Sequence, residues 1–153
     1  MIKMAGKLII VEGIDGSGKT TLIEGLRRLG AFDYHFNYSY PKEAEMFQCG
    51  AFAKGEYAAS IRIFKQLLQR DYTIVCDRFH LGEYAYGPIM RGYPEFFAKK
   101  IVDDTEKQIL ADLKEFEVYV VILHCNPITI SRRKDLRRAV SYTHLTLPTN
   151  REV

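Results

Sequence analysis

The stretch "KLIIVEGIDGSGKT", from Lys7 to Thr20, decides the fold. Its first half is a short run of Ile and Val bounded by glycines, which is typical of a buried parallel strand. Its second half fits the phosphate-loop pattern G-x-x-x-x-G-K-[ST], and a helical pattern follows it. A strand, a glycine-rich loop and a helix in this order predict an α/β domain that binds a phosphorylated ligand.

Each position of the loop has a chemical reason. The glycines let successive backbone N–H groups point inward at phosphate oxygens, and the amino end of the helix favours negative charge. Lys19 reaches the terminal phosphates, and the hydroxyl of Thr20 is a ligand for Mg²⁺. The expected ligand is therefore ATP with Mg²⁺. The predicted ATP-binding residues are Gly13, Asp15, Gly16, Ser17, Gly18, Lys19, Thr20 and Thr21.

Strands and helices alternate along the rest of the chain. Helical spacing of apolar residues predicts helices over 19–29, 56–70 and 94–116, with another beginning at Pro127. Apolar runs or period-two alternation predict strands over 31–40, 72–78 and 118–125. This order predicts a parallel sheet covered by helices on both faces. Ligands of such sheets bind at the carboxyl ends of the strands.

A second group of polar residues follows the third predicted strand. Asp77 is a candidate ligand of Mg²⁺ through water, and Arg78 offers a planar fork to a phosphate. Arg91 is a second cation nearby, while Phe79, Tyr84 and Tyr86 offer flat faces on which a base could stack. The alternative is an Asp77–Arg78 ion pair of structural importance only, with the aromatic residues in the core. Because switches, motors and kinases all contain a phosphate loop, this second site decides the function.

The motifs "VEGIDGSGKTT", "DRF" and "AYGPIMRG" together resemble the thymidylate kinase and deoxynucleoside kinase branch of the nucleoside monophosphate kinases. The resemblance runs from Lys7 to about Arg138. It implies ATP-dependent phosphorylation of a deoxynucleoside monophosphate, with dTMP as the first choice. The alternatives are a deoxynucleoside kinase that phosphorylates the sugar 5′-hydroxyl, with Asp15 or Asp77 as base, and an ATPase without an acceptor.

The resemblance also implies roles for individual residues. It places Asp15 near the sugar of the acceptor and Arg78 on the acceptor phosphate. Lys42, in "SYPKE", is a further phosphate contact unless it is only a solvated lysine in a turn. The catalytic set is Asp15, Lys19, Asp77 and Arg78; the substrate-binding set is Asp15, Lys42, Arg78, Phe79, Tyr86 and Arg91; Thr20 and Asp77 are the metal ligands. The family motif "AYQG" is replaced here by "AYGP", which leaves the base preference open.

Basic residues near the end of the chain form the last part of the implied site. The phosphate loop contains no arginine, and relatives of that kind supply catalytic arginines from a lid. The lid candidates are Arg132, Arg133, Arg137 and Arg138, with a solvated basic helix face as the alternative.

The composition sets broad limits. The chain has 153 residues, 47% of them hydrophobic and 27% charged, with a net charge of +3. These values fit one soluble domain and do not indicate a partner that is a nucleic acid polymer. Three widely spaced cysteines and the lack of a long apolar run favour a reduced cytoplasmic protein without a membrane span. The expected partners are ATP and a deoxynucleotide or deoxynucleoside, and a homodimer is left open for the full-length protein.

The final residues have a different character. "VSYTHLTLPT", from Val140 to Thr149, resembles the translation of a transposon-end adapter used in sequencing libraries. We therefore expect residues 1–139 to be a truncated kinase-like domain, without its last strand and helices, and residues 140–153 to be a non-native tail. The alternative is a genuine Ser/Thr-rich loop.

Overall fold

The computed structural model describes residues 6–38, 50–90, 92–133 and 135. The strands are β1 (Lys7–Glu12), β2 (Tyr34–Asn37), β3 (Ile74–Asp77) and β4 (Glu117–Ile122). The helices are α1 (Lys19–Arg28), α2 (Gly50–Leu68), α3 (Glu83–Met90) and α4 (Glu95–Asp112), with a short 3₁₀ turn, η2 (His80–Gly82), before α3. Residues 127–133 are also helical.

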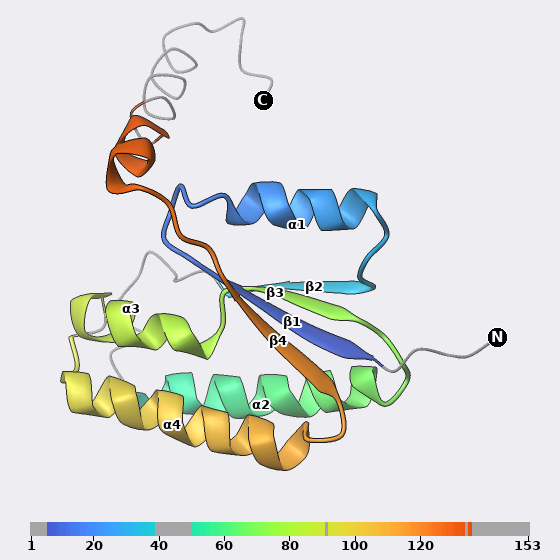
Figure 1. Ribbon diagram of the computed structural model, residues 1–153. Helices are drawn as coiled ribbons and strands as arrows, with labels where there is room; N and C mark the ends of the chain where they lie inside the picture. Colours follow the sequence, from blue (N-terminus) through green and yellow to red (C-terminus); the bar gives the residue numbers. More distant parts are fainter. Residues whose placement is uncertain (1–5, 39–49, 91, 134, 136–153) are drawn as a thin grey trace, which may run out of the picture.

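The strands form one parallel sheet in the order β2-β3-β1-β4. In Figure 1, α1 covers one face of this sheet, and α2, α3 and α4 lie on the opposite face. The predicted fold class, a parallel sheet with helices on both faces, is therefore confirmed. The helix α3 was not among the predicted elements, because Gly87 and Pro88 interrupt its helical pattern.

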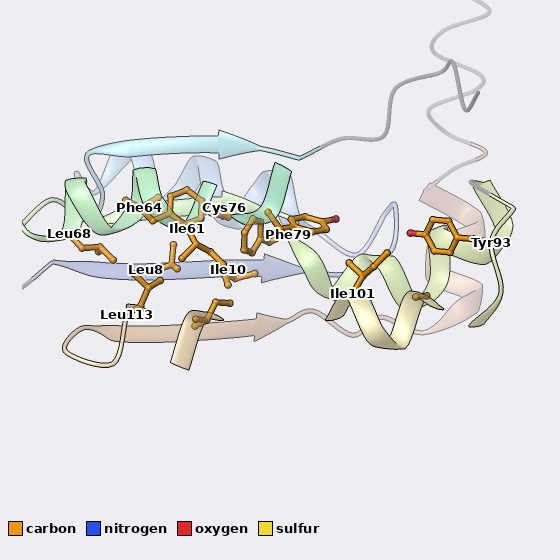
Figure 2. Packing of buried hydrophobic residues seen from close by; sticks show 14 residues of the cluster. Leu8, Ile10, Ile61, Phe64, Leu68, Cys76, Phe79, Tyr93, Ile101 and Leu113 are labelled. Carbon is orange, nitrogen blue, oxygen red and sulfur yellow. The ribbon is translucent and has the colours of Figure 1, made fainter. Parts of the chain in front are cut away.

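Residues of β1 alternate between the two layers of the core. Leu8 and Ile10 belong to the larger cluster, with residues of α2 and α4, whereas Val11 joins the smaller cluster beside α1. Figure 2 shows side chains of the larger cluster, from Leu113 to Phe79, packed along β1. The central strand is thus buried on both faces, which fits the near-continuous apolar run in its sequence.

Two buried polar groups stand out in the layer around α3. The carboxylate of Glu83 accepts hydrogen bonds from the hydroxyls of Tyr57 and Tyr93. The ring of His80 is completely buried, and its Nε2 contacts the carboxylate of Glu106 on α4. These contacts tie η2 and α3 to the neighbouring helices and fix the chain that follows β3.

Within the described ranges, none of the helices is long and apolar enough to cross a membrane. Cys76 and Cys125 are both free thiols.

Candidate active site

The carboxyl ends of β1, β2 and β3 meet at one open cavity of about 230 Å³. It lies where an open parallel sheet is expected to bind its ligand. The structure brings together residues of the phosphate loop and residues that follow the other strands. The lining residues are Asp15, Gly16, Gly18, Lys19, Thr20, Thr21, Asn37, Asp77 and Arg78.

The phosphate loop has the backbone that its sequence predicts. Gly16 and Gly18 have φ angles of 87° and 99°, in the left-handed region that favours glycine. The ammonium group of Lys19 donates to the carbonyl oxygens of Gly13 (2.7 Å) and Ile14 (3.2 Å), so the lysine closes the loop on itself. Burial, together with the charge of Arg78, lowers the pKa of Lys19 from its ordinary value of 10.5. A phosphate in the cavity would favour the charged form of this lysine.

Arg78 projects into the same cavity from the end of β3. Its Nη2 forms an ion pair with Asp15, and its Nη1 donates to the hydroxyl of Tyr86 at 2.7 Å. Its guanidinium carbon also lies 5.3 Å from the centre of the Tyr86 ring. The side chain is only 12% exposed, so its direction is set by these contacts. A planar fork held in this way suits a phosphate that enters between Lys19 and Arg78.

The two residues predicted to bind a metal ion lie at the same cavity. Thr20 and Asp77 both line it, beside Lys19. Among the residues that the structure describes, no group of three or more His, Cys, Asp or Glu side chains could hold a metal ion by itself.

A second hollow of about 460 Å³ shares Gly16, Gly18 and Thr21 with this cavity. Its lining includes Gly18, Leu22 and Arg133. Arg133 comes from the helical residues 127–133, and its Nη1 donates to the carbonyl oxygen of Gly16 at 2.7 Å. One of the predicted lid arginines therefore contacts the loop backbone. Arg132 and Arg133 are both exposed residues.

The predicted stacking residues do not share one environment. The ring of Phe79 is 1% exposed and lies in the core (Figure 2). It packs edge-on against the rings of Tyr38 and Tyr57. This position corrects the expectation that Phe79 offers a free face to a base. Tyr84 is 49% exposed, and Tyr86 contacts Arg78.

Several predicted site residues lie outside the described residues. These are Lys42, Arg91, Arg137 and Arg138. Residues 140–153, expected to be a non-native tail, also lie outside them.

Two residues of this region were not predicted. Asn37 ends β2 and lines the cavity, which the rule about strand carboxyl ends could have indicated. Glu12 ends β1, is 8% exposed, and accepts a hydrogen bond from the backbone N–H of Phe79 at 2.9 Å. The signal for Glu12 was a charged residue at the end of a run of apolar residues expected to be buried, where an unpartnered charge is rare.

Comparison with known proteins adds a relative in sequence. Over 124 residues the chain is 27% identical to the thymidylate kinase of Mycoplasma genitalium, a match that covers 68% of this chain and 55% of that protein. The sequence resembles a thymidylate kinase. This similarity confirms the resemblance to thymidylate kinases that the motifs indicated. The chain spans about half the length of this relative.

No family model matches the sequence. A solved thymidylate kinase from Ehrlichia chaffeensis is 19% identical, with a TM-score of 0.48 and coverage of 92% of this chain and 89% of that one. A deoxyadenosine kinase from M. mycoides, solved with dCMP and a flexible dCDP, is 14% identical, with a TM-score of 0.32 and coverage of 87% and 99%.

Proposed function

We propose that the protein transfers the γ-phosphoryl group of ATP to a deoxynucleoside monophosphate, with dTMP as the preferred acceptor. The observation that carries this proposal is the shared cavity of Lys19 and Arg78. A phosphate loop alone is enough to bind a nucleotide, but an arginine that faces it from the next strand provides a place for a second phosphate. The sequence similarity to a thymidylate kinase supports the same activity.

The residues of the cavity suit an in-line transfer. An oxygen of the acceptor phosphate attacks the γ-phosphorus of ATP, and the bond from that phosphorus to the bridging oxygen of ADP breaks. The acceptor is already an anion, so no general base is needed. Lys19 and the loop N–H groups hold the donor phosphates, and Arg78 holds the acceptor phosphate in line with them.

Mg²⁺ bound with ATP would neutralise charge on the donor phosphates, and Thr20 and Asp77 would hold it. Asp15 already contacts Arg78 at the entrance of the cavity. In this proposal its carboxylate meets the sugar of an acceptor whose phosphate is bound by Arg78.

The test is to follow the products. The protein is incubated with ATP and Mg²⁺, and with dTMP, thymidine or no acceptor, and the nucleotides are separated by anion-exchange chromatography. We expect ADP and dTDP to form in equal amounts from dTMP. Conversion of thymidine to dTMP would instead identify a deoxynucleoside kinase, and ADP release that no acceptor changes would identify an ATPase. Lys99→Ala, an exposed lysine on α4, serves as a control for handling and folding.

A further inference from the structure

The backbone changes direction sharply at Arg78. The N–H of Arg78 donates to the carbonyl oxygen of Val11 at 2.8 Å, which is the last backbone hydrogen bond from this segment to β1. Arg78 itself has a φ angle of 67°, in the left-handed region that L-residues other than glycine rarely occupy. A residue in this conformation persists only where its surroundings hold it there.

The side chain of Glu12 continues the contact where the backbone of β1 stops. The next N–H, that of Phe79, donates to Glu12 Oε1 at 2.9 Å in a buried position. The consecutive N–H groups of Arg78 and Phe79 are therefore both bound to β1, the first by a backbone oxygen and the second by a carboxylate. Two hydrogen bonds to adjacent residues of one rigid strand fix the turn between them.

The charges around Glu12 connect the two halves of the cavity. Burial raises the pKa of Glu12, while the backbone N–H of Phe79, the charge of Arg78, the N–H of Gly82 and the charge of Lys19 act in the opposite direction. The carboxylate of Glu12 therefore interacts electrostatically with Arg78 and Lys19, which both line the cavity. On the other side, the carbonyl of Glu12 accepts the N–H of Leu123 at 2.9 Å, which joins the same residue to the segment after β4.

We propose that Glu12 is a positioning residue: its carboxylate holds the left-handed turn at Arg78 and so directs the Arg78 guanidinium toward Asp15 and Tyr86. Glu12 does not line the cavity and is not expected to touch a substrate. Its effect on an acceptor phosphate rests on the proposed function. Its effect on the turn does not, and the two can be measured separately.

The effect on the turn is tested by mutant cycles. Glu12→Ala is made in the parent, in Arg78→Ala and in Arg78→Gly, and the urea midpoint of each protein is measured. Alanine removes the guanidinium but keeps the unfavourable φ angle, whereas glycine adopts that angle without a steric cost. If Glu12 holds the turn, its loss lets the strained alanine turn relax, whereas glycine stores no strain that could be released. We therefore expect Glu12→Ala to lower the midpoint less in Arg78→Ala than in Arg78→Gly. The parent should lose more than Arg78→Ala, since it also loses the attraction between Glu12 and the charge of Arg78. Equal losses in all three backgrounds would overturn the proposal.

Glu12→Gln keeps an oxygen that can accept the N–H of Phe79, and it replaces Glu12→Ala in the same cycle if the alanine variant does not fold. Glu117→Gln, on an exposed glutamate at the start of β4, is the matched control and should leave the midpoint unchanged.

The effect on the acceptor is tested by kinetics. We expect Glu12→Ala or Glu12→Gln to raise the KM for dTMP tenfold or more and to change the KM for ATP less than threefold. If the KM for dTMP and the KM for ATP change by the same factor, or if neither changes, Glu12 has no specific role in acceptor binding. If the parent itself transfers no phosphate to dTMP, the proposed function fails, and the mutant cycle still decides the role of Glu12 in the turn.

Discussion

Lys19 and Arg78 reach the same cavity from different strands, and each has a different set of contacts. Lys19 is bound to carbonyl groups of its own loop, whereas Arg78 is bound to Asp15 and Tyr86. The sequence predicted both residues because a phosphate loop and a strand end can be recognised locally. It did not predict Glu12 and Asn37, whose positions depend on pairing between distant strands.

These separate contacts predict separate defects. Lys19→Ala should reduce the rate of phosphoryl transfer at least a hundredfold. The loss of a charged hydrogen-bond donor that stabilises the transition state costs about 3 kcal/mol or more. Arg78→Ala should weaken use of the acceptor by tens-fold, roughly 2–3 kcal/mol, and leave the affinity for ATP near that of the parent. Steady-state kinetics with each substrate varied in turn measures both. A collapse of ATP affinity in Arg78→Ala, with the acceptor constant unmoved, would place Arg78 at the donor site instead.

At the scale of elements, strands were easier to predict than the helix after the second site. The strands have apolar runs, and their observed bounds lie within or close to the predicted ones. The helix α3 contains Gly87 and Pro88, which usually end helices, so no helical pattern could be recognised there. The structure supplies a reason for Gly87: a Cβ at this position would lie 2.5 Å from Cε2 of Tyr93.

Two glycines in helices should therefore respond in opposite ways to alanine. Gly87→Ala should lower the free energy of unfolding by about 1–3 kcal/mol, because Tyr93 is buried and its hydroxyl is bound to Glu83. Gly55→Ala in α2 should raise it by about 0.5–1 kcal/mol, since nothing lies within 4 Å of the added Cβ. Urea denaturation of both variants measures the difference. A Gly87→Ala protein as stable as the parent would show that Tyr93 can move aside.

The helical residues 127–133 provide another matched pair. Arg132 and Arg133 are both exposed, and Arg133 also donates a hydrogen bond to the loop carbonyl of Gly16. Arg133→Ala should weaken ATP binding by roughly 1 kcal/mol, about fivefold, because the loop loses a charged hydrogen bond at a partly exposed site. Arg132→Ala should leave the affinity unchanged. Titration calorimetry with ATP compares the two, and equal effects would mean that both arginines act only through their charge.

At the scale of the whole molecule, the alternation of strands and helices was sufficient to predict a parallel, two-sided α/β sheet. The strand order β2-β3-β1-β4 could not be predicted in the same way, because it is set by contacts between residues far apart in the chain. It leaves β4 at an edge, where Tyr119, Val120 and Ile122 are about half exposed. The packing of Phe79 into the core was missed for the same reason, since a local pattern does not show which face of a ring is covered.

The expectation for residues 140–153 leads to a prediction for the molecule as a whole. These residues lack helical periodicity and include Pro148, so we expect them to contribute no packing. Their deletion should leave the melting temperature and the affinity for ATP unchanged. Calorimetry of the shortened and complete chains makes the comparison. A loss of more than about 1 kcal/mol, beyond the scatter of neutral surface changes, would mean that the segment packs as part of the protein.

The buried ring of His80 should make the stability of the protein depend on pH. Burial lowers the pKa of His80 below its ordinary value of 6.5, and the contact with Glu106 only partly offsets this effect. Between the folded and unfolded pKa values the unfolded chain binds the extra proton, so the free energy of unfolding should fall as the pH drops from about 6.5 and level off below the folded pKa. His80→Gln should flatten this part of the profile, as measured by urea denaturation between pH 7.5 and 5. An unchanged slope would mean that other groups cause the loss of stability at low pH.

His80 lies in the turn that follows Arg78, so protonation of its buried ring should loosen that turn first. At low pH the protein would then lose the position of Arg78 in the cavity before it loses the structure of the phosphate loop.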